Sequence, residues 1–184
     1  RLFINQPEHG ALVSELGPYG TPVRSFGELR RTGQEADRNV HLAMNVGLPL
    51  PDPTGGYYFV FLAGVPMFRK YDARGALVFE RHIEGPEVDQ YLRTLPTRWP
   101  TRRTDDGEVL PIVPPAVRTA AVDREGRLWI ALMPTPVTYV YDAVGDKVRT
   151  VQFRGAGILT PNSLFFTRDG RIFVTPGCYE FKVP

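Results

Sequence analysis

One hairpin-forming segment occurs three times in this chain. Its copies read VDREGRLWI (122–130), FTRDGRIFV (166–174) and LPDPTGGYYF (50–59). In the first and third copies an Asp begins the turn and a Gly follows three residues later. This suits a tight turn, because Asp accepts backbone N–H groups and Gly adopts positive φ. The segment RLFI (1–4) aligns with RLWI (127–130), so we expect the chain to begin just after the turn of a fourth hairpin.

A second turn follows each hairpin at a constant distance. It reads YDARG (71–75), YDAVG (141–145) and, in a degenerate form, LGPYG (16–20). About 20 residues separate the hairpin glycine from the glycine of this second turn. Two kinds of turn at constant spacing indicate one four-stranded unit that is repeated along the chain.

The strands between these turns differ in the faces that they bury. Residues 57–62 and 128–132 are apolar on both alternating faces, which is typical of strands covered on both sides. Residues 77–83 and 147–153 alternate apolar with polar and are expected to be half-exposed outer strands. Four-stranded antiparallel units of this kind form the blades of an all-β fold, the β-propeller. The alternative, a parallel β-helix, would have a shorter repeat and few tight hairpins.

The length of the chain sets the number of blades that we expect. At about 40 to 45 residues per blade, the chain holds about three and a half to four units. We therefore expect residues 1–184 to be a single, partial propeller domain, the C-terminal portion of a six-bladed propeller. A four-bladed propeller would fit the length but would need a complete first blade.

Composition agrees with a turn-rich chain and argues against several partner classes. Gly and Pro number 18 each. A formal net charge of +2 is too small to favour nucleic acid or an anionic membrane, and no apolar run is long enough to cross a bilayer. The single Cys178 cannot form an internal disulfide, so cysteine usage leaves the localisation open.

Two insertions interrupt the repeat. Residues 30–39 are polar and are expected to form a flexible loop between blades. Residues 86–115 begin with PEVDQYLRTL, which predicts a short amphipathic helix that stops before Pro96. We interpret the stretch after this helix as a lid or a partner-docking surface; the alternative is a surface elaboration that packs its Trp against the blade edges. Its basic and aromatic residues are Arg98, Trp99, Arg102 and Arg103.

Both insertions are expected on one face of the propeller. In this fold the connections between blades share a face with the loops that join second and third strands, here residues 63–66 and 133–137, and functional loops gather on such a face. Eight residues before the hairpin glycines lie Gly47, Arg118 and Asn162, where the innermost strand should open near the central channel. Arg118 and Asn162 are therefore candidate ligand contacts; the alternative for each is a structural role in binding loop carbonyls.

The segment TPNSLFFTRDGRIFVT (160–175) resembles the Pro-Asn-x-hydrophobic, Asp-Gly-x-hydrophobic pattern of the gluconolactonase family. The chain as a whole is similar to the six-bladed propeller superfamily of NHL-repeat, TolB-like and gluconolactonase-type proteins. Through MFRKYD (67–72) and PGCYEF (176–181) it resembles uncharacterised bacterial members. The resemblance implies a divalent cation such as calcium bound by Asn162, and a periplasmic or extracellular location. Thr175 departs from the pattern, because an acidic residue commonly follows this strand in the family.

The remaining reactive side chains suggest no further site. His9 and His41 are expected in loops of the same face and His82 on an outer strand, without metal-ligand spacing. Cys178 is interpreted as a partly buried, inert thiol, with a nucleophile beside a His as the alternative. The turn carboxylates are expected to cap backbone N–H groups: Asp72, Asp123 and Asp142.

Two function classes follow. The first is a non-enzymatic scaffold that binds a protein, a peptide or a small ligand through its loop face and needs no cofactor. The second is a metal-dependent hydrolase of the gluconolactonase or lactonase type, in which a cation in the channel polarises a carbonyl and activates water. We favour the first, because Asn162 alone does not complete a metal cage.

Overall fold

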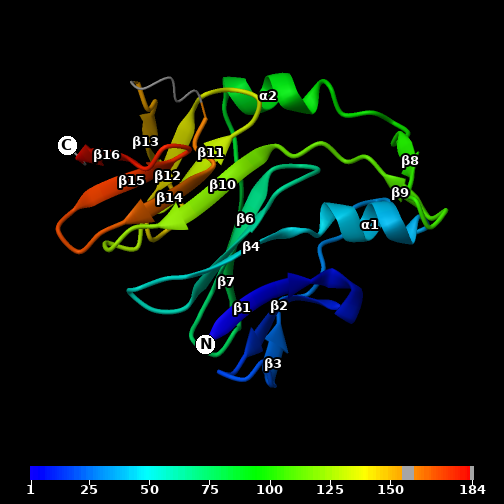
Figure 1. Ribbon diagram of the computed structural model, residues 1–184, viewed down its shortest axis with the longest axis horizontal. Helices are drawn as coiled ribbons and strands as arrows, with labels where there is room; N and C mark the ends of the chain where they lie inside the picture. Colours follow the sequence, from blue (N-terminus) through cyan, green and yellow to red (C-terminus); the bar gives the residue numbers. More distant parts are fainter. Residues whose placement is uncertain (155–159, 183–184) are drawn as a thin grey trace.

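The computed structural model describes residues 1–154 and 160–182 of the chain. Its strands form blade-like antiparallel sheets that follow one another in chain order around an arc (Figure 1). The first strands of three neighbouring sheets contact one another in turn: β4 (Gly47–Pro51), β10 (Val117–Val122) and β14 (Ser163–Phe166). This arrangement confirms the expected all-β, propeller-like architecture.

Two of the sheets have the four strands that the repeat predicts. Each runs in chain order from an inner to an outer strand. The first contains β4, β5 (Tyr57–Phe61), β6 (Met67–Tyr71) and β7 (Leu77–His82). The second contains β10, β11 (Leu128–Leu132), β12 (Thr138–Tyr141) and β13 (Lys147–Val151). β5 and β11 are buried on both faces, whereas β7 and β13 are mostly exposed, so the expected order of inner and outer strands is confirmed.

The two flanking sheets have three strands each in the described part of the chain. The N-terminal sheet contains β1 (Leu2–Gln6), β2 (Ala11–Leu16) and β3 (Pro22–Phe26), with a single 3-10 turn η1 (Pro7–His9) between its first two strands. The C-terminal sheet contains β14, β15 (Arg171–Thr175) and β16 (Tyr179–Lys182). β1 pairs with β2 and contacts β4, the inner strand of the next sheet. That the chain begins just after the turn of a fourth hairpin stays a prediction.

The turns use the chemistry that the sequence indicated. Asp123 Oδ1 accepts hydrogen bonds from the backbone N–H groups of Glu125 (3.1 Å) and Arg127 (2.9 Å). Gly126, at φ +79°, and Gly145, at φ +88°, take the left-handed conformation that closes each kind of turn. The strand pairing also shifts register just before the second turn of three units, at Glu15/Leu16, Lys70/Tyr71 and Val140/Tyr141. The three units therefore also share a β-bulge at the same position.

The apolar core lies between neighbouring sheets. One cluster joins the two four-stranded sheets, and includes Tyr58, Phe68, Ile130 and Tyr139. Two smaller clusters lie on either side of it: one contains Leu12 with Phe59, and the other contains Trp129 with Ile172. Each sheet therefore depends on its neighbours to cover its faces.

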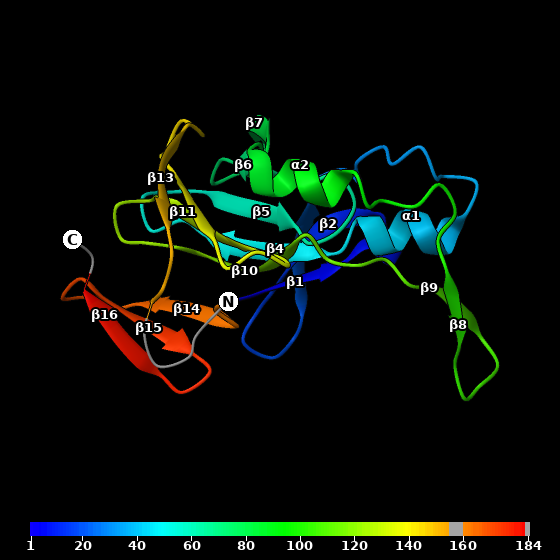
Figure 2. The ribbon, with the colours of Figure 1, turned by 90° about the horizontal axis from the view of Figure 1, so that it is seen from above.

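The two insertions are more ordered than the sequence suggested. The second contains helix α2 (Pro86–Leu92), which confirms the predicted helix, and then a hairpin of β8 (Thr101–Arg103) and β9 (Val109–Pro111) that was not predicted. The hairpin projects away from the sheets (Figure 2).

No helix among residues 1–154 and 160–182 is long and apolar enough to cross a membrane.

The loop expected over residues 30–39 is confirmed for residues 30–37, which form no helix or strand, but its last two residues are helical. Helix α1 (Arg38–Met44) begins inside this insertion, where the Asp37 side chain accepts the Val40 N–H at 3.1 Å. Val40 and Met44 bury one face of the helix. His41, expected in a loop, therefore lies on α1, and Arg30 at the start of the insertion is buried.

Candidate functional site

A pocket of about 550 Å³ lies where the two insertions meet the first four-stranded sheet. Residues 30–34 of the first insertion form one wall, and residues 95–99 of the second insertion form another. Gly64 and Val65, in the loop between β5 and β6, also line it. Both insertions and the loop between β5 and β6 therefore lie on one face, as the propeller interpretation of the sequence predicted.

The Arg30 guanidinium forms a buried part of this wall. Its two terminal nitrogens donate to the carbonyl oxygens of Val65 (2.6 Å), Met44 (2.5 Å) and Ala63. The group also lies 4.3 Å from the centroid of the Phe61 ring. Arg30 thus ties the loop between β5 and β6 to the end of α1.

Burial lowers the pKa of Arg30 without removing its charge. Desolvation, followed by the nearby charge of Arg69, lowers the pKa of Arg30 to about 10. The group therefore stays protonated at neutral pH. No carboxylate of the described residues lies within 4 Å of it; the acid that acts on it is the more distant Glu80.

The floor of the pocket comes from β6 and the outer strand β7. Their pairing sets Arg69 opposite Glu80 and Met67 opposite His82, and all four residues line the pocket. Arg69 Nε donates to Glu80 Oε2 at 2.5 Å, so this carboxylate is already paired. The result is a floor with one ion pair, one thioether and one imidazole.

The second insertion adds apolar surface. Trp99, Leu95 and Pro96 line the pocket from the segment between α2 and β8. The two insertions also touch each other, because α1 contacts β9 and the Asn39 side chain donates to the Val109 carbonyl at 3.4 Å. The two walls that the insertions form are therefore also connected to each other directly, through α1 and β9.

The sequence-predicted contacts bind each other: Arg118 lies on β10 and Asn162 directly precedes β14. Arg118 Nε and Nη2 both donate to Asn162 Oδ1, at 2.9 and 2.6 Å. Arg118 Nη1 also lies 3.9 Å from the sulfur of Met133. The oxygen that the family resemblance assigns to a cation thus accepts two hydrogen bonds from a guanidinium. Calcium at Asn162 stays a prediction.

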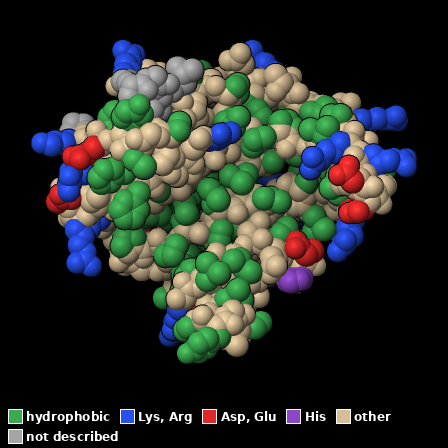
Figure 3. All heavy atoms as spheres, in the orientation of Figure 1, with side chains coloured by type: hydrophobic (Ala, Val, Ile, Leu, Met, Phe, Trp, Pro, Cys, Tyr) green, Lys and Arg blue, Asp and Glu red, His purple; other side chains and the backbone are tan. Residues whose placement is uncertain are grey.

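The other candidate residues are divided between the pocket and the surface. Trp99 lines the pocket, whereas Arg102 and Arg103 are exposed on β8 and do not line it. Figure 3 shows hydrophobic side chains in the middle of the face seen in Figure 1 and basic side chains around its rim. No group of three or more His, Cys, Asp and Glu side chains in the described ranges could hold a metal ion.

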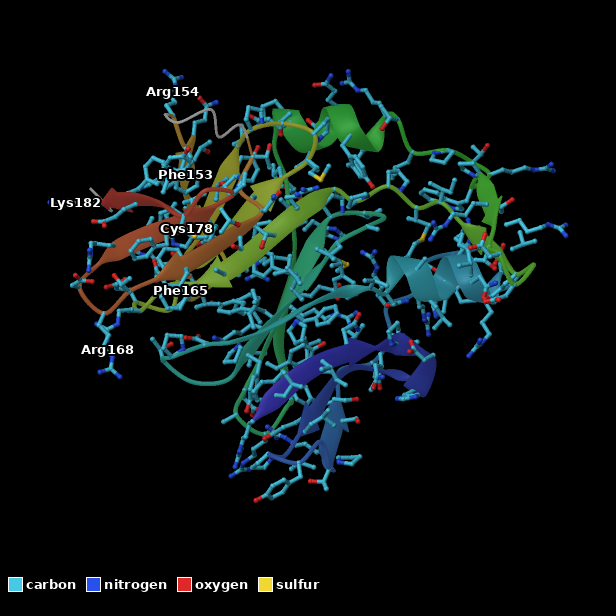
Figure 4. The ribbon with its side chains drawn as sticks, viewed as in Figure 1. Phe153, Arg154, Phe165, Arg168, Cys178 and Lys182 are labelled. Carbon is cyan, nitrogen blue, oxygen red and sulfur yellow. The ribbon has the colours of Figure 1, made fainter. Side chains whose placement is uncertain are left out.

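Cys178 is not the partly buried thiol that the sequence suggested. It is exposed, at φ +53°, in the turn that joins the ends of β15 and β16 (Figure 4). Phe165, labelled in the same view, is 65% exposed on β14. Neither residue lines the pocket between the insertions.

Sequence reasoning missed the charged and titratable residues of the pocket, namely Arg30, Arg31, Arg69, Glu80 and His82. The spacing of two along the strands was an available signal, since Met67 and Arg69 share one face of β6 and Glu80 and His82 share one face of β7. No such signal marked Arg30. Its acceptors are backbone carbonyls from distant segments.

Comparisons with known proteins were made for both sequence and structure. No family model matches the sequence, and no curated protein sequence matches it. The structure is similar to that of selenomethionine-substituted virginiamycin B lyase from Staphylococcus aureus, with 14% sequence identity and a TM-score of 0.45. The match covers 99% of this chain, which spans 66% of the lyase chain.

A second solved structure is a protein of unknown function from Bacteroides caccae, with 13% identity and a TM-score of 0.28. That match covers 68% of this chain and 51% of the other. The fold assignment rests on the sheet arrangement described above rather than on these likenesses.

Proposed function

We propose that this chain is a non-enzymatic propeller scaffold that binds a small ligand in the pocket between its two insertions. From the family resemblance we further infer that its sheets belong to a six-bladed propeller. The observation that carries the binding proposal is the pocket itself, about 550 Å³ in volume and built by both insertions over β6 and β7. Ligand sites in proteins commonly have volumes of roughly 300 to 1,000 Å³.

The chemistry of the walls supports ligand binding. Trp99, Leu95 and Met67 offer apolar and aromatic surface, and a few polar groups converge on the same space. Such a combination is typical of small-molecule sites, in which apolar contacts give affinity and a few polar groups fix orientation. The scaffold beneath is rigid, because β5 and most of β6 are buried.

The experiment is an NMR titration that follows the indole N–H of Trp99. The chain has two tryptophans, so two indole signals are expected, and a Trp99→Phe variant assigns them. The probes share a phenyl body and differ in charge: 4-phenylbutyrate, 4-phenylbutanamide and 4-phenylbutylamine. A saturable shift of the Trp99 signal by at least one probe is expected. No shift with any of the three would overturn the proposal.

Two matched variants locate the binding. Val65→Trp should fill the pocket and abolish the shift, because Val65 lines it and is 46% exposed. Val144→Trp should leave the shift unchanged, because Val144 is also exposed, at 61%, but lies in the turn after β12. Arg102→Ala and Arg103→Ala should also leave it unchanged, since neither residue lines the pocket. Equal loss in both tryptophan variants would contradict the location.

A further inference from the structure

The pocket holds more positive charge than its own residues neutralise. Arg30, Arg31 and Arg69 line it together with a single carboxylate, that of Glu80. Glu80 is bound to Arg69. Two arginines are therefore left without a carboxylate partner within 4 Å in the described part of the chain.

These two arginines differ in what they offer a ligand. Arg30 is only 7% exposed and its guanidinium is held by three carbonyls, so it contributes a fixed charge within the wall. Arg31 is exposed at the pocket edge, where its planar fork is available to a ligand. A buried charge without a counterion costs free energy that a bound anion would recover.

We propose that the ligand of this pocket is an amphipathic carboxylate, with an apolar body against Trp99, Leu95 and Met67 and its anionic group toward Arg31 and Arg30. The proposal rests on the proposed function and specifies the ligand class of the same site. A carboxylate fits because one guanidinium fork matches its two oxygens in a bidentate pair. The fixed charge of Arg30 adds attraction without needing to move.

The same three probes test this ligand class. 4-Phenylbutyrate should bind about tenfold tighter than 4-phenylbutanamide, because a hydrogen bond to a charged group is worth more than its neutral counterpart. 4-Phenylbutylamine should bind more weakly than the amide. Phenyl phosphate, a fourth probe, should bind no tighter than 4-phenylbutyrate. If it bound tenfold tighter, the site would be one for phosphate esters and the carboxylate assignment would be lost.

A charge-removing variant identifies the group that contacts the anion. Arg31→Gln should bring the affinity for 4-phenylbutyrate down to that for the amide and leave the amide affinity unchanged. The variant is expected to fold, because Arg31 is exposed. Arg74→Gln is the matched control, an exposed arginine in the turn between β6 and β7 that does not line the pocket. Its affinities should equal those of the parent chain.

The outcomes separate this inference from the proposed function. Equal affinity for the acid and the amide, both abolished by Val65→Trp, would overturn the carboxylate class while leaving a ligand site in place. Binding of the acid that Arg31→Gln does not weaken would also overturn it. Absence of binding by every probe would remove both proposals together.

Discussion

An insertion precedes the first strand of each four-stranded sheet, and the two insertions bury very different groups. Before β4, the chain places the Arg30 guanidinium against backbone carbonyls and leaves a pocket of about 550 Å³ beside it. Before β10, helix α2 places Val88 and Tyr91 in the interior, and the gap between them and Leu132 has no room for a water molecule. A sealed apolar junction holds sheets together, whereas a charged and open one leaves space for a ligand.

The contrast also changes how the second insertion should be tested. Removing residues 86–115 would remove Val88 and Tyr91, which are 3% and 6% exposed, from the interior. We expect that deletion to unfold the chain rather than to report on binding. Point variants distinguish the two junctions more cleanly.

The largest effect is expected at the apolar junction. Tyr91→Ala removes a buried aromatic ring and its hydrogen bond to the Pro114 carbonyl at 2.9 Å. The free energy of unfolding should fall by about 3 to 4 kcal/mol, measured by urea denaturation. Gln90→Ala, at an exposed position of the same helix, should change it by less than about 0.5 kcal/mol. A loss for Tyr91→Ala as small as that of the control would contradict the sealed junction.

A smaller loss is expected at the charged junction. Arg30→Ala leaves the carbonyls of Val65, Met44 and Ala63 without their donor, which should lower the free energy of unfolding by about 2 to 3 kcal/mol. Arg30→Lys should recover only part of this loss, because an ammonium lacks the planar fork that reaches several acceptors. Full recovery in the lysine variant would show that charge, and not hydrogen-bond geometry, holds this junction.

The two junctions should also respond differently to acid. The hydrogen bond from the Tyr139 hydroxyl holds the pKa of Glu87, on α2, below its usual value of 4.5. The resulting stability is present above that value and is lost as pH falls through the lower folded-state pKa. Glu87→Gln should therefore cost about 1 kcal/mol at pH 7 and progressively less below pH ~4.5, measured by urea denaturation across pH.

Arg30→Ala is the control for this pH series. No carboxylate of the described chain lies within 4 Å of Arg30, and Glu80 acts on it only from a greater distance, so the cost of this variant should change much less than that of Glu87→Gln over the same range. If the loss in the free energy of unfolding shrank equally with falling pH in both variants, titration of Glu87 would not explain the difference between the two junctions.

The smallest effect is expected where the insertions touch. Asn39→Ala removes the exposed hydrogen bond to the Val109 carbonyl and should change the free energy of unfolding by less than about 0.5 kcal/mol. If the two insertions form one site, the same variant should still weaken ligand binding, because α1 and β9 would be less firmly linked. The titration of the Trp99 indole with 4-phenylbutyrate measures this.

The sequence allowed the scaffold to be predicted because its signals are local. The glycines at 75, 126 and 145 and the carboxylates before them fix turns through neighbours within a few residues. The helix at 86–92 follows from its proline, its acids and its apolar face. The repeat also predicted that Arg118 and Asn162 occupy the same position in neighbouring units, and in the structure the two side chains are hydrogen-bonded.

The pocket could not be predicted in the same way, because it depends on long-range contacts. Arg30 is held by the carbonyls of residues 44, 63 and 65. Every residue has a backbone carbonyl, so no sequence pattern marks the ones that bind Arg30. Read alone, a polar segment such as 30–39 is typical of a loop. The burial of its first residue depends on how α1 packs beside the loop between β5 and β6.

The most direct test of the proposed site uses the methyl groups of methionine. The chain has three methionines: Met44 and Met67 line the pocket, whereas Met133 lies beside Arg118, at the site favoured from the sequence. Methionine labelled with ¹³C at the methyl group would give one signal for each during titration with 4-phenylbutyrate. The proposed site predicts saturable shifts for Met44 and Met67 and none for Met133. A shift of Met133 alone would place the ligand at Arg118 and Asn162 and contradict the site between the insertions.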